Sequence, residues 1–545
     1  MIMNTKRRYN FILLLCVAVM GITSGCKKFL DINKNPGNPQ EVKAEFMLPR
    51  IIFQMANGTA QDYVQVGKLV QYWTSGAVND FYERHGATPL NSDVTGVIWR
   101  MNYADLGINV DDMIADAIAN KKYEYAGIGY AIKAWSFQIT TDMYGEIILD
   151  EAFNPGQLTF AYQNQKEVYE RVREWNALAL KYLNMKGPVD YTSVLAGPSG
   201  DFVYRGDMTK WRKFVYGNLA LHYSHLINKP NFANTYADSV LKYVDLSFVS
   251  STEDATVKFT ATAAEDMNVL GPTYGLHTAA TNGRISSTIL NLLTGGVRGT
   301  PAIDTNASVD PRLSRMLSNV PVTNPLDTGI YRGNTPTKGT VTISGIPGTP
   351  SIYGPATGPV TDPYPGKYIF ANTTQYPLMS YSQLQFAKAE ILFIKGDKPA
   401  ALSAYQNGIR AHMSFVNLYG TAGTDFKAIT SAEIERYMQS SEVVRDVNDL
   451  KISDIMNQKY IAQWGWAALE QWSDLRKYHY DPTVFTQYYQ LTGSEFAPNN
   501  NSKYAYRHRP RFNSEYAWNA SEVERIGGKQ ADYNTKETWF STAEN

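Results

Sequence analysis

LQFAKAEILFIKGDKPAALSAYQNGIRAHM, from Leu384 to Met413, is the stretch that decides the fold. Apolar residues recur at helical spacing on both sides of Lys395-Gly396-Asp397, and these three residues break the pattern. Small side chains lie where the two helices would meet and allow close packing: Ala387, Ala389, Ala400, Ala401 and Ala404. The stretch therefore predicts two paired helices of the tetratricopeptide type.

Two earlier segments have the same form. Ala126–Phe153 and Gln165–Leu183 are both amphipathic at helical spacing and are separated by a loop. Trp211–Asp245 is a second pair, which Asn228-Lys229-Pro230 breaks into two helices. No strict tetratricopeptide period connects the three pairs, so they are diverged or convergent hairpins. Together they predict a helical scaffold.

The interval from Ser247 to Gln375 has a different composition. It contains GIPGTPSIYGPATGPVTDPYPG (Gly345–Gly366), in which Gly, Pro and Thr leave little room for a helix and only short strands fit. Only Ile285–Gly295 has a helical pattern there. Long irregular segments on a rigid scaffold often form binding surfaces, so we expect this insert to contribute to a ligand site.

The N-terminus has the three regions of a secretion signal. Residues 6–8 are basic, Phe11–Gly21 is apolar, and residues 23–25 are small. Cys26 follows directly, as in a bacterial lipobox, and an ordinary signal peptide followed by an unrelated cysteine is the alternative. We expect a signal peptide over 1–25 and a lipid-anchored, flexible tether over 26–40. The other cysteine, Cys16, lies inside the signal, so no disulfide is expected.

Charge and aromatic content narrow the class of function. Lys and Arg total 51, as do Asp and Glu, so the formal net charge is zero and the electrostatic footprint of a nucleic-acid binder is missing. Tyr, with 37 residues, is the commonest aromatic side chain. Such amphipathic rings suit a wet recognition surface for sugars or peptides, and a tyrosine-rich core is the alternative. We expect no nucleic-acid partner.

Seven stretches carry a family resemblance. In chain order they are CKKFLDINKNPGNP from Cys26, WRMNYADLGINVDDM from Trp99, DMYGEIIL from Asp142, DFVYRGDMTKWRKFVYGNLAL from Asp201, DPRL from Asp310, YPLMSYSQLQFAKAEILFIKGD from Tyr376 and QKYIAQWGWAALEQWSDLRK from Gln458. Together they resemble the SusD/RagB family of Bacteroidetes surface lipoproteins, and especially its second SusD-like branch. Their order and their span along the chain make the set specific.

The resemblance implies a mainly α single domain over 41–545, with tetratricopeptide-like hairpins packed against an irregular, loop-rich half of few short strands, including the insert at about 247–375. It implies a non-catalytic lipoprotein that binds oligosaccharides, or peptides in RagB-like members, and delivers them to a SusC-like TonB-dependent transporter. The anchor at Cys26 would hold the protein on the outer membrane, facing the cell exterior. Lys27 and Lys28 replace an acidic export signal, so a periplasm-facing orientation stays open.

Candidate ligand contacts lie in two regions. The loop from Tyr72 to Trp99 concentrates aromatic and polar side chains without a helical stripe to bury them, and the insert adds others beside Gly. The resemblance implies sugar contacts for Trp99 and Asn102, and a core position at a helix start is the alternative for Trp99. The candidates are Trp73, Asn79, Phe81, Tyr82, Trp99, Asn102, Tyr274 and Arg284.

Enzyme chemistry has little support in the residue pattern. His222 and His225 are three apart on a predicted helix and could face one metal ion, but no third ligand or general-base motif accompanies them. A carboxylate pair such as Asp80 and Glu83 fits a solvated loop edge better than an acid/base couple. We therefore expect no metal, no cofactor and no catalytic residue. A glycoside hydrolase and an adhesin are the remaining alternatives.

Overall fold

The computed structural model describes residues 42–86, 92–273, 283–296, 302–304, 310–319, 330–343, 348–352, 366–421 and 426–544. The chain divides after Lys43 into two compact units. All elements below belong to the second unit, Ala44–Asn545, and the expected signal peptide and tether lie outside the described residues. In the part of the chain that the structure describes, no helix is both long and apolar enough to cross a bilayer.

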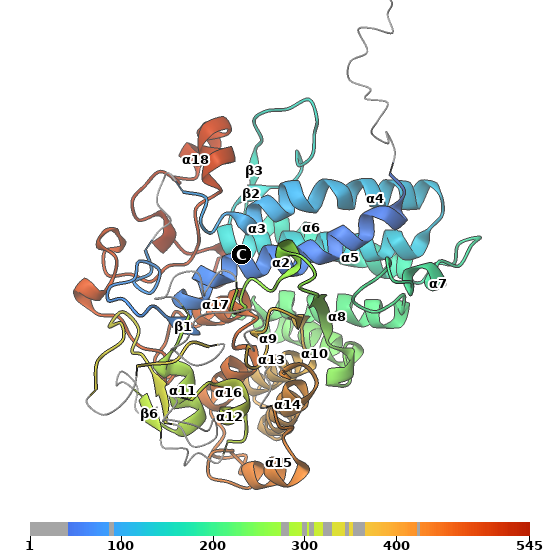
Figure 1. The fold of residues 1–545 in the computed structure, drawn as a ribbon. Coiled ribbons are helices and arrows are strands. Elements are labelled where there is room, and N and C mark those ends of the chain that lie inside the picture. Colours follow the sequence, from blue (N-terminus) through green and yellow to red (C-terminus); the bar gives the residue numbers. More distant parts are fainter. Residues whose placement is uncertain are drawn as a thin grey trace, which may run out of the picture. The chain divides into compact units, whose positions relative to one another are not determined.

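Helices dominate the second unit (Figure 1). They are α2 (Ala44–Leu69), α3 (Val97–Arg100), α4 (Gly107–Ala119), α5 (Tyr123–Tyr144), α6 (Gln165–Leu183), α7 (Thr192–Leu195), α8 (Met208–Ser224), α9 (Phe232–Thr235), α10 (Ala237–Leu246), α11 (Ser287–Thr294), α12 (Arg312–Met316), α13 (Tyr381–Ile394), α14 (Lys398–Tyr419), α15 (Ser431–Met438), α16 (Ile452–Gln463), α17 (Ala468–Lys477) and α18 (Ala520–Arg525). Two π-helical turns, η1 (Met101–Asp105) and η6 (Phe512–Tyr516), accompany them. The mainly α class that the sequence predicts is confirmed.

The described strands are short and form antiparallel pairs. They are β1 (Trp73–Thr74) with β5 (Arg284–Ile285), β2 (Ile147–Ile148) with β3 (Tyr162–Gln163), β4 (Ala255–Phe259) with β8 (Thr374–Met379), and β6 (Ala302–Asp304) with β7 (Tyr331–Gly333). The predicted insert contributes β4 to β7 and the start of β8. The prediction of few, short strands in this interval is confirmed.

Leu384–Met413 forms most of the hairpin α13–α14. The turn passes through Gly396, whose φ of +84° lies in the left-handed region that favours glycine. Asp397 then caps α14, because its Oδ1 accepts a hydrogen bond from the Ala400 backbone N–H at 3.2 Å. Gly408 of α14 packs against the ring of Phe386 in α13, where an added Cβ would lie 2.8 Å from a ring atom. Close packing here depends on Gly408, which was not among the predicted small residues; of those, Ala387, Ala389, Ala401 and Ala404 are buried and Ala400 is partly buried.

The first predicted hairpin differs in length from the expectation. The pattern predicts helix through Phe153, but α5 ends at Tyr144 because Gly145 has a φ of +84°. The chain then forms β2 and pairs with β3, which leads into α6. The second hairpin breaks where predicted, since α8 ends at Ser224 and α10 follows after a short α9.

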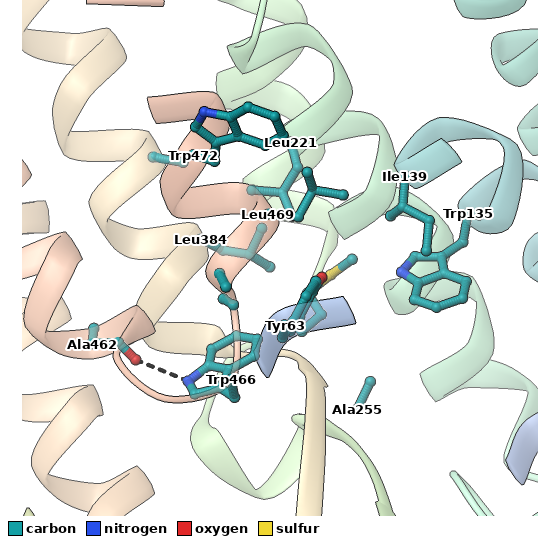
Figure 2. Packing of buried hydrophobic residues seen from close by; sticks show 14 of the residues in the cluster. Tyr63, Trp135, Ile139, Leu221, Ala255, Leu384, Ala462, Trp466, Leu469 and Trp472 are labelled. Atoms are coloured by element: carbon teal, nitrogen blue, oxygen red, sulfur yellow. Dashed lines mark hydrogen bonds between the residues drawn. The ribbon is translucent and has the colours of Figure 1, made fainter. Parts of the chain in front are cut away.

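Large aromatic side chains fill the core beneath α16 and α17 (Figure 2). Trp466 and Trp472 are 2% and 0% exposed, and Tyr63 of α2 lies close to Trp466 in this view. The Trp466 Nε1–H donates to the Ala462 carbonyl at 3.1 Å, so its polar atom is paired within the apolar cluster. This packing joins the C-terminal helices to the N-terminal helix α2.

An ionic cluster is buried between α13, α16 and α17. Its members are Glu390, Lys459, Asp474 and Lys477, each at most 1% exposed. Both lysine Nζ atoms contact Asp474 Oδ1, at 2.7 Å from Lys459 and 2.9 Å from Lys477, and Lys477 also contacts Glu390 Oε1 at 2.8 Å. Burial raises the pKa of Asp474, but the two ammonium groups outweigh burial and lower it to about 2. The four charges therefore neutralise one another inside the scaffold.

Candidate ligand-binding site

A cavity of about 410 Å³ lies between the α3–η1–α4 region, the β2–β3 loop and η6; we call it the Trp99 cavity. Its volume lies in the range of small-molecule binding sites. Apolar side chains make most of its wall: Trp99, Tyr103, Ile108, Phe153 and Phe160. Aromatic faces and edges around a concave space are the surface that a sugar ring or an apolar side chain can occupy.

The π-helical turn η1 shapes one wall of the Trp99 cavity. The Leu106 N–H donates to the Met101 carbonyl at 3.0 Å, five residues back, so the turn is wider than an α-helical one. A Cβ at Gly107 would lie 1.8 Å from the Asn102 carbonyl oxygen, so the wide turn leaves no room for a side chain there. Single π turns inside helices are frequent at functional sites.

Trp99 is a structural part of this wall. It is 2% exposed, and its indole ring packs against Tyr103, Tyr144 and Tyr162 with ring centroids 5.1, 5.2 and 5.7 Å away. The Trp99 Nε1–H donates to Glu515 Oε1 at 3.2 Å. Because so little of the ring is exposed, Trp99 supports the cavity more than it offers a free face.

Glu515 of η6 connects three elements around the cavity. Besides Trp99, it accepts hydrogen bonds at Oε2 from the Tyr162 hydroxyl at 2.5 Å and from Asn519 Nδ2 at 3.1 Å. Burial and the Glu515 carboxylate both raise the pKa of Tyr162, which keeps this hydroxyl a donor. The carboxylate thus fixes η6 against α3 and β3.

Two arginines bring charge to the cavity. Arg100 Nε lies 2.9 Å from Asp105 Oδ2, and Arg511 Nη2 lies 2.6 Å from Asp93 Oδ2. Their side chains are 45% and 24% exposed, so both guanidinium groups are paired yet reach solvent. Such donors suit hydroxyl or carboxylate groups of a ligand.

Asp62 of α2 supports the helix that carries Trp99. Its Oδ2 accepts from the Ile98 N–H at 2.7 Å, at the start of α3. Burial raises the pKa of Asp62 to about 7 despite this bond. The carboxyl group therefore acts as a buried cap for α3.

The predicted ligand contacts separate into two places. Trp99 lines the cavity; Asn102 is buried beside it, and its amide has no hydrogen-bond partner among the described residues. The others that the structure describes lie around the β1–β5 pair and do not line the cavity: Trp73, Asn79, Phe81, Tyr82 and Arg284. Tyr274 lies outside the described residues. Contact of any of these residues with a ligand stays a prediction.

Hydrogen bonds hold the β1–β5 region together. Trp73 is fully buried, pairs with Ile285 across the two strands, and donates from Nε1 to the Val64 carbonyl at 3.0 Å. Arg284 donates from Nη1 to Ser351 Oγ at 2.8 Å. Asn79 is exposed, and Phe81 is 40% exposed.

Glu83 differs from the predicted solvated loop edge. It is 1% exposed, and its carboxylate accepts hydrogen bonds from the backbone N–H groups of Ser75 and Thr337. Burial raises its pKa to about 8. Asp80, in contrast, pairs with Lys68 Nζ at 2.8 Å. The expectation was wrong for Glu83 because the segment around Thr337, 254 residues further along the chain, packs against it and helps to bury its carboxyl group.

Most cavity residues were not among the predicted contacts. Phe153 and Phe160 flank a turn-rich segment, Asn154-Pro155-Gly156, and aromatics beside such a turn were the available signal. Glu515 follows Gln490–Arg511, a segment with Gly, Pro and Asn residues that are typical of loops, and no local pattern marks Glu515 as a wall residue. None of the described residues of the insert lines the Trp99 cavity.

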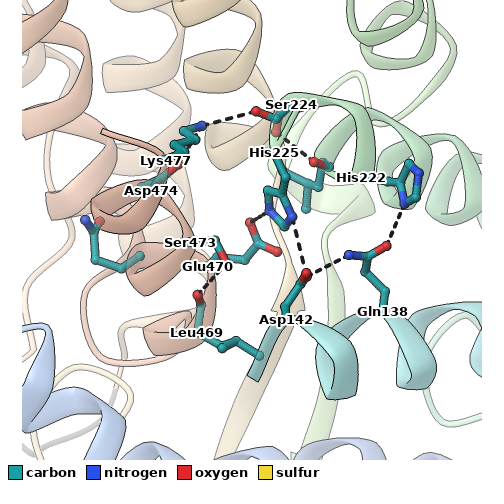
Figure 3. Close-up of polar contacts among 12 residues, drawn as sticks. Gln138, Asp142, His222, Ser224, His225, Leu469, Glu470, Ser473, Asp474 and Lys477 are labelled. Atoms are coloured by element: carbon teal, nitrogen blue, oxygen red, sulfur yellow. Dashed lines mark hydrogen bonds and ion pairs between the residues drawn. The ribbon is translucent and has the colours of Figure 1, made fainter. Parts of the chain in front are cut away.

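His225 lies between two carboxylates (Figure 3). Its Nδ1 is 3.4 Å from Asp142 Oδ2, and its Nε2 is 3.2 Å from Glu470 Oε2. These three residues are close enough to hold a metal ion. However, although burial lowers the pKa of His225, Glu470 and Asp142 raise it to about 9, so the imidazole is protonated and both nitrogens donate. His222 instead faces Gln138, so the two histidines that lie three apart in the sequence do not share one site.

Comparison with known families gives one match that covers most of the chain. A family model, SusD-like_2, described as "Starch-binding associating with outer membrane", matches residues 36–509. Comparison with curated protein sequences found no match.

Solved structures share the fold. A SusD/RagB family protein from Bacteroides thetaiotaomicron is 21% identical with a TM-score of 0.66, over 93% of this chain and 100% of that one. A SusD homolog from Bacteroides fragilis is 16% identical with a TM-score of 0.66, over 92% and 100% of the two chains. A protein described as chitin-binding is 19% identical with a TM-score of 0.67, over 91% and 99%. At these identities the likeness establishes the fold.

Proposed function

This chain belongs to the SusD-like family described as starch-binding and associated with the outer membrane, and from that premise we propose that it binds an oligosaccharide in the Trp99 cavity. The observation that carries the proposal is the cavity itself, a space of about 410 Å³ whose walls are largely aromatic. Tyr103, Phe153 and Phe160 are only partly buried there, so they keep surface for the C–H faces of sugar rings.

The polar groups of the cavity support a ligand that is rich in hydroxyls. Arg100 and Arg511 already pair with aspartates, so neither is an unpaired charge that demands an anion. Their outer N–H groups, together with Asn154 and Ser514, offer donors and acceptors near the apolar wall. A peptide, as in RagB-like importers, is the alternative ligand and is an outcome of the test below.

Capture without catalysis is the role that fits this wall. Among the described residues that line the Trp99 cavity, Glu515 is the only carboxylic acid. It already accepts from Trp99, Tyr162 and Asn519. Glycoside hydrolases in general use two carboxyl groups on either side of the scissile bond, so this wall supports a binding protein over a hydrolase.

We further propose that the protein works at the outer membrane beside a SusC-like TonB-dependent transporter and delivers the glycan to it. The proposed signal peptide over 1–25 would be removed, Cys26 would carry the lipid, and 26–40 would be a tether for a single domain over 41–545. A Cys26→Ala chain should move from the membrane fraction to the soluble fraction, whereas membrane retention would contradict the anchor.

The binding proposal is tested by a screen of the full chain in detergent. Affinity electrophoresis and calorimetry against starch, chitin oligosaccharides and a peptide mixture name the ligand class, and chromatography of the mixtures detects products. We expect retention on a glycan with no product released. Heat only with peptides would move the protein to the peptide-importing branch, and released sugars would overturn the non-catalytic role.

A further inference from the structure

An exposed tryptophan lies next to the Trp99 cavity. Trp518 is 70% exposed, although tryptophan is usually largely buried. Leu158, in the β2–β3 loop, is 78% exposed, and Ile108 in the cavity wall is 45% exposed. Along the chain, Leu158 lies between the wall residues Pro155 and Phe160, and Trp518 lies three residues after the wall residue Glu515.

The backbone on both sides of Trp518 is fixed to the cavity wall. Three residues earlier, Glu515 is buried and holds Trp99. One residue later, Asn519 Oδ1 accepts from the Phe160 N–H at 3.0 Å, and Asn519 Nδ2 donates to the Phe160 carbonyl at 2.9 Å. The Tyr162 N–H also donates to Glu522 Oε2 of α18 at 2.8 Å. Figure 1 shows α18 beside β3, in agreement with these bonds.

Trp518 follows the cavity wall closely along the chain. Ser514 and Glu515 line the cavity, and Trp518 comes four and three residues later, directly after the π-helical turn η6. The hydrogen bonds of Glu515, Asn519 and Glu522 therefore hold the backbone on both sides of Trp518 next to the cavity wall.

We infer that Trp518 forms an outer subsite, on which one sugar ring of an oligosaccharide stacks while the rest of the chain occupies the Trp99 cavity. The inference rests on the proposed function and adds a length preference to it. A flat sugar ring can cover the large exposed indole face, and because the backbone is already fixed, only the side chain has to be ordered on binding.

The surroundings of Trp518 favour a sugar over a protein partner. A stable protein interface covers about 800 Å² on each side around an apolar centre. The residues that are exposed close to Trp518 along the chain are instead small, polar or charged: Asn513, Ala517 and Arg525. Polar groups near an exposed aromatic face suit a ligand that is rich in hydroxyl groups.

The test compares a long and a short glycan on the full chain in detergent. Calorimetry measures Kd for maltoheptaose and maltose, and for chitohexaose and chitobiose, with the wild type and Trp518→Ala. We expect Trp518→Ala to weaken the longer glycan that binds by about tenfold and to change the shorter one by less than about twofold. Trp518→Phe keeps an aromatic face and should restore most of the affinity.

Phe46→Ala is the matched control. Phe46 lies on α2 and is 75% exposed. The 2.9 Å bond from the Ala44 N–H to Asp116 shows that this part of α2 lies beside the C-terminal end of α4. Ile108 of the cavity lies at the opposite, N-terminal end of α4. It should leave every Kd unchanged. Equal affinity of wild type and Trp518→Ala for the long glycan would overturn the outer subsite alone, whereas a wild type that binds none of the four glycans would overturn the proposed function.

Discussion

The ionic cluster and the Trp99 cavity both bring together side chains from distant parts of the chain, but only the cavity leaves apolar surface uncovered. In the ionic cluster, Asp474 contacts two lysines, each side chain is at most 1% exposed, and the charges neutralise one another. In the cavity, Glu515 is also fully bonded, but Phe153 and Phe160 face about 410 Å³ of open space. Convergence of titratable groups alone is therefore a poor sign of a binding site, and unfilled apolar wall is a better one.

The largest expected effect comes from opening the ionic cluster. Asp474→Ala leaves Lys459 and Lys477 buried with too little negative charge, and removal of one partner from a buried ion pair costs about 3–5 kcal/mol. Urea unfolding of the wild type and the variant, followed by circular dichroism, measures the free energy of unfolding.

Lys388→Ala is the control for this variant. Lys388 pairs with Asp245, which is 61% exposed, and exposed ion pairs contribute at most about 1 kcal/mol. A loss in Asp474→Ala no larger than that in Lys388→Ala would show that the cluster is not a structural centre.

The second effect concerns pH and His225. Its folded pKa of about 9 exceeds the ordinary value of 6.5, so the folded state binds the proton more tightly than the unfolded state. The stabilisation is complete below pH 6.5 and is lost as the pH rises to about 9, a change of order 3 kcal/mol. His225→Gln should lower stability at pH 6.5 and matter little above pH 9, as measured by urea midpoints.

The wild type and His225→Gln are compared at each pH because Glu83, with a pKa of about 8, titrates in the same range. The difference between the two slopes isolates the imidazole. A variant that is equally destabilised at pH 6.5 and above pH 9 would mean that His225 is held by packing and not by its charge.

The scaffold was more predictable than the site for a physical reason. The α13–α14 hairpin follows from local signals, since Gly396 and Asp397 set the turn and small residues set the contact. The extent of α5 was overestimated because one residue, Gly145, ends the helix while the apolar pattern continues into β2. Periodicity detects apolar faces, and it does not tell whether a helix or a short strand buries them.

The cavity could be predicted only in part because its walls come from distant segments. Trp99 was identified through a family resemblance. Phe160 and Glu515 are 355 residues apart in the sequence, but both line the cavity. Hydrogen bonds of Tyr162 and Asn519 connect their two segments. Glu83 shows the same limit, because its backbone partner Thr337 is 254 residues away. Spacing along the sequence carries no signal for such contacts.

The third effect distinguishes the Trp99 cavity from the loop around Phe81 as the place where a ligand binds. Phe160→Ala removes an aromatic ring from the cavity wall and should weaken glycan binding by about 1–3 kcal/mol. Its effect on the free energy of unfolding should be smaller, because the ring is only partly buried. Phe81→Ala is the matched variant, since Phe81 is 40% exposed and does not line the cavity. Calorimetry with maltoheptaose and chitohexaose gives Kd for both variants.

The comparison between cavity and loop can fail in an informative way. If Phe81→Ala loses affinity while Phe160→Ala keeps it, the ligand lies in the loop from Tyr72 onward, as the sequence first suggested, and the Trp99 cavity is not the site. Equal losses would mean that one ligand spans both regions.

The smallest effect is a stability change far from both regions. Thr430 begins α15 with a capping box, in which Thr430 Oγ1 accepts from the Glu433 N–H at 3.2 Å and Glu433 Oε2 accepts from the Thr430 N–H at 2.8 Å. Thr430→Ala should cost about 1 kcal/mol, the usual value of an N-cap, and leave Kd for maltoheptaose or chitohexaose unchanged. Since α15 packs against α14 and contributes nothing to the cavity wall, this variant measures what a modest loss of stability does to binding. If its affinity falls as much as that of Phe160→Ala, the loss in Phe160→Ala reflects weakened folding and not a missing contact. The contrast between the closed ionic cluster and the open Trp99 cavity would then lose its support.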